Sequence, residues 1–148
     1  MKKSIVLSAA LLPLISYSSF AMSLQSLNKD QLIKTFQGNT VTTVPLTTLD
    51  DQLVSNAISV YLDKDGKSQG KYANPPKDEE PQTDQGTWTA KNDGTFCITW
   101  QHWNDGKQGC VFVYKLGNGY LIVNSENNNF ESIVLKDVQY GNQLDSES

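Results

Sequence analysis

Two hydrophobic segments of different pattern occupy the first 36 positions. A continuous apolar run from Ile5 to Ile15 follows two lysines, and small residues come after it at positions 19–21. This order is typical of a secretory signal peptide, because the run is too short to span a bilayer as a stable helix. We expect residues 1–21 to be cleaved, with no membrane anchor left, which places the mature protein in the periplasm or outside the cell. An uncleaved membrane anchor is the alternative.

The second segment has helical spacing and predicts one short helix from about Lys29 to Phe36. Asn28 precedes it as an N-cap, and Gly38 follows at the position typical of a C-terminal cap. The apolar face of this helix would consist of Leu32, Ile33 and Phe36.

Strand-length runs of β-branched and aromatic residues, separated by polar turns, fill the rest of the chain. The early runs cover 39–44, 57–62 and 67–72, and a loop is expected from Pro45 to Asp51. Residues 73–85 (ANPPKDEEPQTDQ) carry three prolines and a run of acids, which predicts a long exposed loop. A last strand is predicted between Phe130 and Tyr140. Residues 141–148 are polar and are expected to form a flexible tail.

Three polar triplets divide the region from Gly86 to Tyr120 into hairpins: 92–94 (NDG), 104–106 (NDG) and 117–119 (GNG). If each turn takes three residues, simple pairing gathers the large side chains on one inward face. That face comprises Trp88, Phe96, Ile98, Trp100, Phe112, Tyr114, Leu116, Tyr120 and Ile122.

The whole pattern predicts a single, mostly β domain from residue 22 to 140, with one short N-terminal helix and about eight antiparallel strands. Local connections favour a meander that forms an up-and-down barrel or a strongly curved sheet, because closure removes exposed edges. An open sheet with a covering helix is the competing arrangement.

The two cysteines, Cys97 and Cys110, are expected to form a disulfide, because an exported chain meets an oxidising compartment. Free thiols or a redox role are less supported, since no C-x-x-C motif is present to lower a thiol pKa. The hairpin register above puts the two cysteines on opposite faces of the sheet. The sequence therefore predicts irregular backbone between His102 and Gly109, either an extended loop or a bulge at Gly109.

Charge excludes some classes of ligand. The formal net charge is −4, and without the two leader lysines it becomes −6, since twelve basic residues become ten against sixteen acidic ones. The sequence has no arginine. Nucleic acid and phosphorylated ligands are therefore not expected, because both need clustered basic groups.

Metal and catalytic chemistry find little support in the sequence. The D-x-D-G at 63–66 has its glycine too early for a calcium loop of the EF-hand type, so a solvated hairpin turn is expected, and we predict no metal and no cofactor. His102 could contact a ligand or carry a proton, or it could be a surface histidine at a strand end. Since no motif frames a serine or cysteine nucleophile, we do not predict an enzyme.

Short motifs in the mature chain resemble an uncharacterised family of small exported bacterial proteins that are regarded as lipocalin-like, that is, calycin barrels. They are F-x-G-N-T from Phe36, a Y-x-x-D-G-like hairpin from Tyr61 with one inserted residue, G-T-W from Gly86, D-G-x-x-C-x-x-W from Asp93, the second cysteine, and V-Y from Val113. The resemblance implies a β-barrel with a mouth and a disulfide. It implies no activity.

Two functions from different classes remain. In the first, the barrel binds a small apolar or aromatic ligand, with Trp88, Trp100, His102, Phe112, Tyr114 and Tyr120 as the ligand-binding residues; the same aromatics could instead be plain core. In the second, the protein is an interaction or inhibitor module whose acidic loop, Lys77 to Gln85, binds a basic protein partner while the barrel is a scaffold.

Overall fold

The computed structural model of the chain describes residues 24–45, 47–49, 52–54, 57–73, 81–134 and 138–145. The predicted signal peptide lies outside these residues, as do positions 74–80 of the expected acidic loop. In the described residues, no helix has both the length and the apolar character needed to cross a membrane.

The predicted helix is confirmed as α1 (Lys29–Phe36). A capping box begins it, because the Asn28 side chain accepts from the Gln31 N–H and the Gln31 side chain accepts from the Asn28 N–H. Gly38 follows the helix with φ of +75°, a left-handed conformation that glycine adopts without strain. Leu32 and Phe36 are buried, so this face of the helix packs on the sheet.

Antiparallel strands make up most of the described chain. Their bounds are β1 (Asn39–Pro45), β2 (Thr47–Leu49), β3 (Gln52–Val54), β4 (Ile58–Leu62), β5 (Lys67–Tyr72), β6 (Thr83–Ala90), β7 (Phe96–Trp100), β8 (Gln108–Leu116), β9 (Gly119–Asn124), β10 (Phe130–Val134) and β11 (Gln139–Tyr140). A short turn segment, η1 (Trp103–Gly106), lies between β7 and β8.

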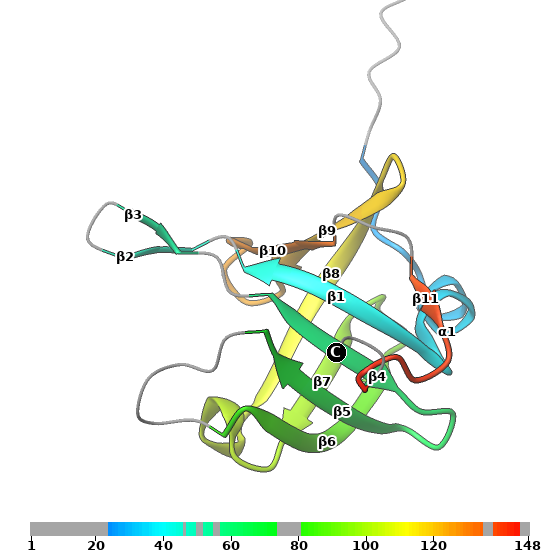
Figure 1. Cartoon of the computed structure of the whole chain (residues 1–148). Coiled ribbons are helices and arrows are strands. Elements are labelled where there is room, and N and C mark those ends of the chain that lie inside the picture. Colours follow the sequence, from blue (N-terminus) through cyan, green and yellow to red (C-terminus); the bar gives the residue numbers. More distant parts are fainter. Residues whose placement is uncertain are drawn as a thin grey trace, which may run out of the picture.

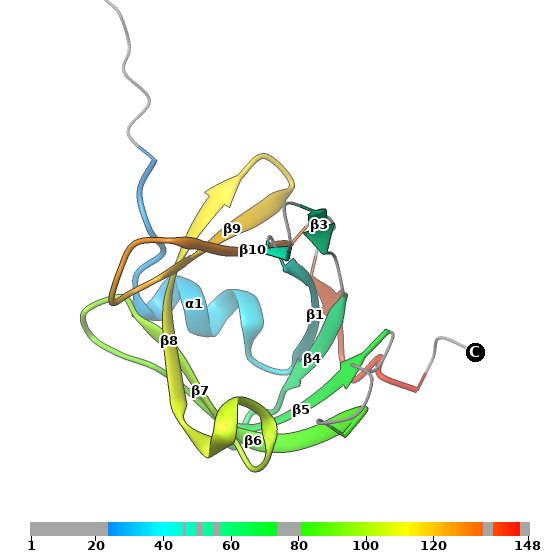
Figure 2. The same cartoon turned by 90° about the vertical axis from the view of Figure 1, so that its left-hand side faces the viewer.

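The main sheet closes into a barrel. Its neighbours run in the order β10-β9-β8-β7-β6-β5-β4-β1, and β10 pairs back with β1, so that eight described strands form a ring; β11 adds to the outside of β1. Figure 2 looks down this ring and shows α1 lying across it. The prediction of a lipocalin-like, mostly β fold of about eight antiparallel strands with one short helix is confirmed.

Helix α1 and the β7–β8 connection lie at opposite ends of the barrel (Figure 1). Near the start of β7, Phe36 packs against Phe96 with ring centroids 5.8 Å apart. The chain before the helix crosses the same end, where the Leu27 N–H donates to the Val113 carbonyl at 2.7 Å. One end of the barrel is therefore covered by the N-terminal segment, and the other is bordered by loops.

The first predicted hairpin register is correct. Trp88 pairs with Ile98 and Ala90 with Phe96, and the Lys91 N–H donates to the Thr95 carbonyl across the turn. Side chains alternate along a strand, so the large residues of β6 and β7 face the barrel interior as expected.

The predicted register of β8 is wrong. Cys97 pairs with Cys110 and Phe96 with Val111, whereas the predicted three-residue turn at 104–106 would place Phe96 opposite Tyr114. The reason is the length of the connection: Thr99 pairs with Gln108, so eight residues, 100–107, lie between the last paired positions instead of three, and the register shifts by three residues. Since the shift is by an odd number of residues, β8 presents its other face to the interior.

Strand β9 nevertheless keeps its predicted face. The β8–β9 turn has two residues, Gly117 and Asn118, instead of three, so Val113 pairs with Ile122. This shift is by one residue and the first was by three; because both are odd, β9 returns to the predicted face, and Tyr120 and Ile122 point inward as expected.

Three other boundaries differ from the prediction. The stretch expected as a loop from Pro45 to Asp51 contains β2, which pairs with β3 directly after it. The long acidic loop ends at Gln82, because β6 already begins at Thr83. The expected flexible tail is held at its start: the Thr40 hydroxyl donates to the Gly141 carbonyl and accepts from the Gln143 N–H, and Leu144 is buried.

Candidate functional site

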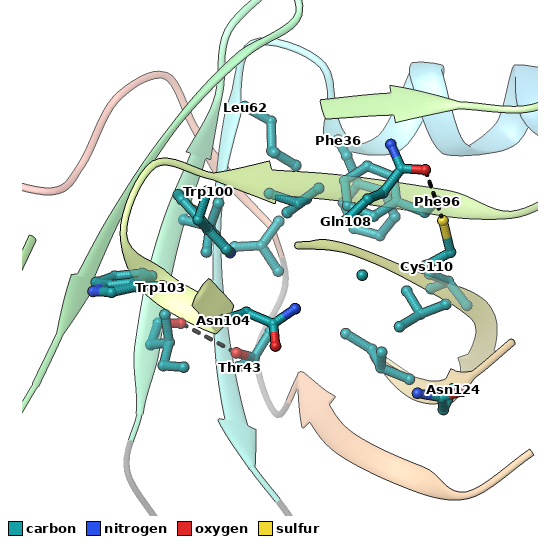
Figure 3. Close-up of a pocket in the computed structure, with 18 of the residues that line it drawn as sticks. Phe36, Thr43, Leu62, Phe96, Trp100, Trp103, Asn104, Gln108, Cys110 and Asn124 are labelled. Carbon is teal, nitrogen blue, oxygen red and sulfur yellow. Dashed lines mark hydrogen bonds between the residues drawn. The ribbon is translucent and has the colours of Figure 1, made fainter. Parts of the chain in front are cut away.

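A cavity of about 720 Å³ occupies the barrel interior. Its wall is made mainly of aliphatic and aromatic side chains from the inward faces of the strands, with polar residues near the loop end (Figure 3). The lining residues that recur below are Phe36, Val60, Leu62, Phe96, Trp100, Trp103, Asn104, Lys107, Val111, Val113 and Glu126.

The helix end of the cavity is closed by packed aromatic rings. Phe36 of α1 contacts Phe96 and also Tyr120, with centroids 5.4 Å apart in the second pair. Trp88 stacks on the other side of Phe96 at 5.6 Å, and its indole N–H donates to the Asp63 carbonyl. Because these buried rings close the helix end, the polar residues of the lining lie at the loop end.

The β7–β8 loop, residues 101–107, borders that open end, and a disulfide fixes its base. Cys97 and Cys110 lie directly opposite each other on β7 and β8, with Cα atoms 4.1 Å apart and the sulfurs bonded. The predicted bridge and the predicted irregular backbone between His102 and Gly109 are both confirmed. Of the two proposed forms of irregularity, the extended loop is the correct one.

Two non-glycine residues in the left-handed region turn this loop back toward β8. Asn104 and Asp105 have φ of 57° and 53°, and Gly106 follows with 67°. Asparagine and aspartate tolerate this conformation better than other residues with a side chain, which explains the local sequence N-D-G. The same triplet at 92–94 forms a tight hairpin turn, so the letters alone do not determine the loop.

A buried carboxylate holds the loop in place. Asp84 of β6 accepts the backbone N–H groups of His102 and Trp103 on Oδ2, each at 2.8 Å, and contacts His102 Nδ1 through Oδ1 at 3.0 Å. Burial alone would raise the pKa of Asp84, but the hydrogen bonds from Trp103, His102 and Gln85 together lower it to about 2. The group is therefore ionised at neutral pH, and its charge is balanced by donors from one loop.

Trp103 is the side chain that Asp84 positions. It is buried, its indole N–H donates to the Pro81 carbonyl at 2.8 Å, and its ring packs against Trp100 at 4.8 Å and Tyr72 at 4.4 Å. Gly70 makes room for these rings, because a Cβ there would overlap Trp103 and come within 2.8 Å of Trp100. The result is an aromatic wall at the open end of the cavity.

The predicted ligand-binding residues fall in four places. Trp100 lines the cavity, whereas Trp88 and Tyr120 are buried in the core beneath it. His102 is exposed and bound to Asp84, away from the lining. Phe112 and Tyr114 alternate with Val111 and Val113 of the lining, so their placement on the inward face was wrong: they lie on the outer face of β8.

Sequence reasoning missed Asp84 and Trp103 as site residues. Asp84 lay in a stretch interpreted as a solvated acidic loop, and its neighbour Thr83 is the only β-branched residue there. Trp103 lay in the stretch predicted as irregular backbone. The signal for Trp103 was the aromatic content around His102, which a solvent-exposed turn would not need, whereas no pattern in the sequence marks Asp84.

The charged groups at the open end carry opposite signs. Lys107 and Glu126 contribute to the lining, and Lys107 Nζ lies 3.0 Å from the Asp105 carboxylate. Among the described residues, no group of three or more histidine, cysteine, aspartate or glutamate side chains could hold a metal ion. The arrangement offers an apolar chamber with polar contacts at one end, which suits binding.

Comparison of the chain with family models, with curated proteins and with solved structures finds no match.

Proposed function

We propose that this protein binds a small, largely apolar molecule inside its barrel. The observation that carries the proposal is the 720 Å³ cavity, which falls in the range of about 300–1,000 Å³ that accommodates small-molecule ligands. An eight-stranded barrel is just wide enough to be filled by its own side chains or to hold one such molecule. A cavity of this size supports the second alternative.

The chemistry of the wall supports an apolar ligand. The inner half is lined by apolar residues such as Leu62, Phe96 and Val113. A bound apolar molecule gains free energy when its surface leaves water and contacts these side chains. Trp100 and Trp103 add aromatic surface at the open end. Their position also makes tryptophan fluorescence a direct reporter of occupancy.

The proposal includes an exported location. The Cys97–Cys110 disulfide supports an oxidising compartment, such as the periplasm or the extracellular space. Mass spectrometry of the protein recovered from cell fractions tests this part: we expect a chain that begins at Met22 in the periplasmic or secreted fraction. A full-length chain retained in the cytoplasm would contradict it.

Ligand binding is tested with a neutral fluorescent probe, N-phenyl-1-naphthylamine, whose emission rises in an apolar site. We expect saturable binding to the oxidised mature protein and a change in tryptophan emission. The filling variant Val111→Trp should abolish binding, because Val111 lines the cavity. Its neighbour provides the matched control: Phe112→Trp on the outer face should bind as the parent does. Equal binding by both variants, or none by the parent, would refute the proposal.

The interaction-module alternative depends largely on residues 77–80, which lie outside the described part of the chain. It stays a prediction. Deleting the acidic loop and comparing partner capture would test it.

A further inference from the structure

The inner half of the cavity has no place for a charge. Its lining consists of Phe36, Val60, Leu62, Phe96 and Val113, all apolar. A charged group of a ligand would lose its hydration there without gaining a partner, which is strongly unfavourable. A ligand must therefore place any polar group at the open end.

At the open end, the charges do not favour an anion. Among the described lining residues, Lys107 is the one cation, and it is already paired with Asp105 at 3.0 Å. Glu126 adds a negative charge to the lining. Asp84 lies next to this end, ionised and with both oxygens engaged by His102, Trp103 and Gln85, so it repels an anion and offers a ligand no acceptor.

Asn104 is an uncharged side chain at the open end that can contact the polar group of a ligand. Its side chain points from the loop toward the cavity in Figure 3, and its amide nitrogen donates to the Lys107 carbonyl at 3.1 Å. Within the described residues, its amide oxygen accepts no hydrogen bond. A carbonyl-type oxygen in this position can accept from a hydroxyl group, whereas it repels the oxygens of a carboxylate.

We infer that the cavity selects uncharged lipophilic molecules that carry a hydroxyl group, such as long-chain alcohols, and discriminates against carboxylates of the same length. The apolar chain lies toward Phe36 and the hydroxyl group toward Asn104. This inference rests on the proposed function, since it names the class of ligand for the same cavity.

The test is displacement of N-phenyl-1-naphthylamine from the oxidised mature protein by 1-dodecanol and by dodecanoate at about pH 8, where the carboxyl group is ionised. We expect dodecanol to bind about tenfold more tightly or better, because the carboxylate has no free cation to meet. Equal or tighter binding of dodecanoate overturns the inference, and so does failure of dodecanol to displace a bound probe. Failure of the probe itself to bind refutes the proposed function instead.

Two matched glycine variants separate the contacts. Asn104 and Asp105 both have positive φ, so glycine replaces either one without backbone strain. Asn104→Gly should weaken dodecanol about fivefold, the loss of one hydrogen bond. Asp105→Gly frees Lys107 and should strengthen dodecanoate about threefold with dodecanol unchanged. Asp105→Gly replaces a residue outside the cavity lining and should keep the affinity for the probe, so a loop that merely loosens is recognised by a change in probe binding of this variant. Unchanged dodecanol affinity in Asn104→Gly contradicts the assigned contact.

Discussion

A hydrogen bond of 2.8 Å joins the carboxylate of Asp84 on β6 to the backbone N–H of Trp103 in the β7–β8 loop. The same oxygen accepts the His102 N–H. Two peptide groups of the β7–β8 loop thus depend on one side chain of β6, and the position of the Trp103 ring depends on both.

Asp84→Ala should lower the free energy of unfolding by about 2–4 kcal/mol, because it leaves two N–H groups of the loop without their acceptor. Chemical denaturation monitored by circular dichroism measures this. The control is Asp105→Gly: the carboxylate is 85% exposed and glycine accepts the positive φ of this position without strain, so stability should change by less than about 1 kcal/mol. Similar effects of the two variants would mean that Asp84 does not hold the loop.

The pH dependence of stability should carry the signature of Asp84. Its folded-state pKa of about 2 lies below the ordinary value of 3.8, so the stability it contributes is present above about pH 4 and is lost as the pH falls toward 2. The expected contribution is about 2 kcal/mol. Other carboxyl groups titrate in the same range, so the quantity to measure is the difference between the parent and Asp84→Asn from pH 7 to 2. A difference that stays constant over this interval would contradict the prediction.

Gly70→Ala should destabilise the protein by about 1–3 kcal/mol and shift tryptophan emission, because the added methyl group overlaps the Trp103 ring and lies within 2.8 Å of Trp100. Gly109→Ala is the matched control. A Cβ at that position meets its nearest neighbour, Asn104 Nδ2, at 3.9 Å, an ordinary contact. Denaturation and fluorescence of the pair should differ clearly, and equal behaviour would show that the close packing over Gly70 is not required.

Removal of the disulfide in Cys97→Ala/Cys110→Ala should cost about 3 kcal/mol, since the bridge closes a loop between residues 13 positions apart. Reduction of the parent protein should reproduce the loss. A double variant as stable as the oxidised parent would indicate that the hydrogen bonds of Asp84 alone set the register of β8.

Asn28→Ala should lower stability by about 1 kcal/mol through loss of the capping box of α1. Thermal unfolding measures the effect. Lys34→Ala, a change at an exposed position of the same helix outside the capping box, is the control and should be close to neutral.

The sequence correctly predicted those parts of the fold that depend on interactions between residues close together in the chain. The helix bounds followed from the Asn28 cap and the spacing of its apolar residues, and the β6–β7 hairpin followed from the N-D-G turn. The barrel followed from the number of short strands joined by local turns. None of these required knowledge of distant contacts.

Which side chains of β8 point into the barrel could not be predicted in the same way, because the identical N-D-G triplet has different conformations at 92–94 and at 104–106. The second triplet is drawn out of a tight turn by contacts from β6, a long-range effect. One constraint in the sequence could have corrected the register: a bridge between Cys97 and Cys110 on adjacent strands requires them to lie opposite each other. That pairing alone places Val111 and Val113 inward.

Asp84 was hidden by its surroundings. The residues before it are prolines and acids, which are typical of exposed loops, and a single buried aspartate has no pattern of its own. Its role depends on the N–H groups of His102 and Trp103, which approach only after the barrel has folded. Sites that a loop and a strand assemble together are therefore the part of this protein least accessible to sequence reasoning.

The closure of the ring between β1 and β10 has a consequence for folding kinetics. The other contacts within the ring join strands that follow one another along the described chain, or, for β1 and β4, strands separated only by β2 and β3. In contrast, β1 and β10 meet from near its two ends through the pairs Val44–Ile133 and Pro45–Ser132. The entropy of closing such a long loop must be lost for few hydrogen bonds, and proline donates none. The hairpins should therefore form early and the β1–β10 pairing last, so that the slowest step of folding is the one that encloses the cavity.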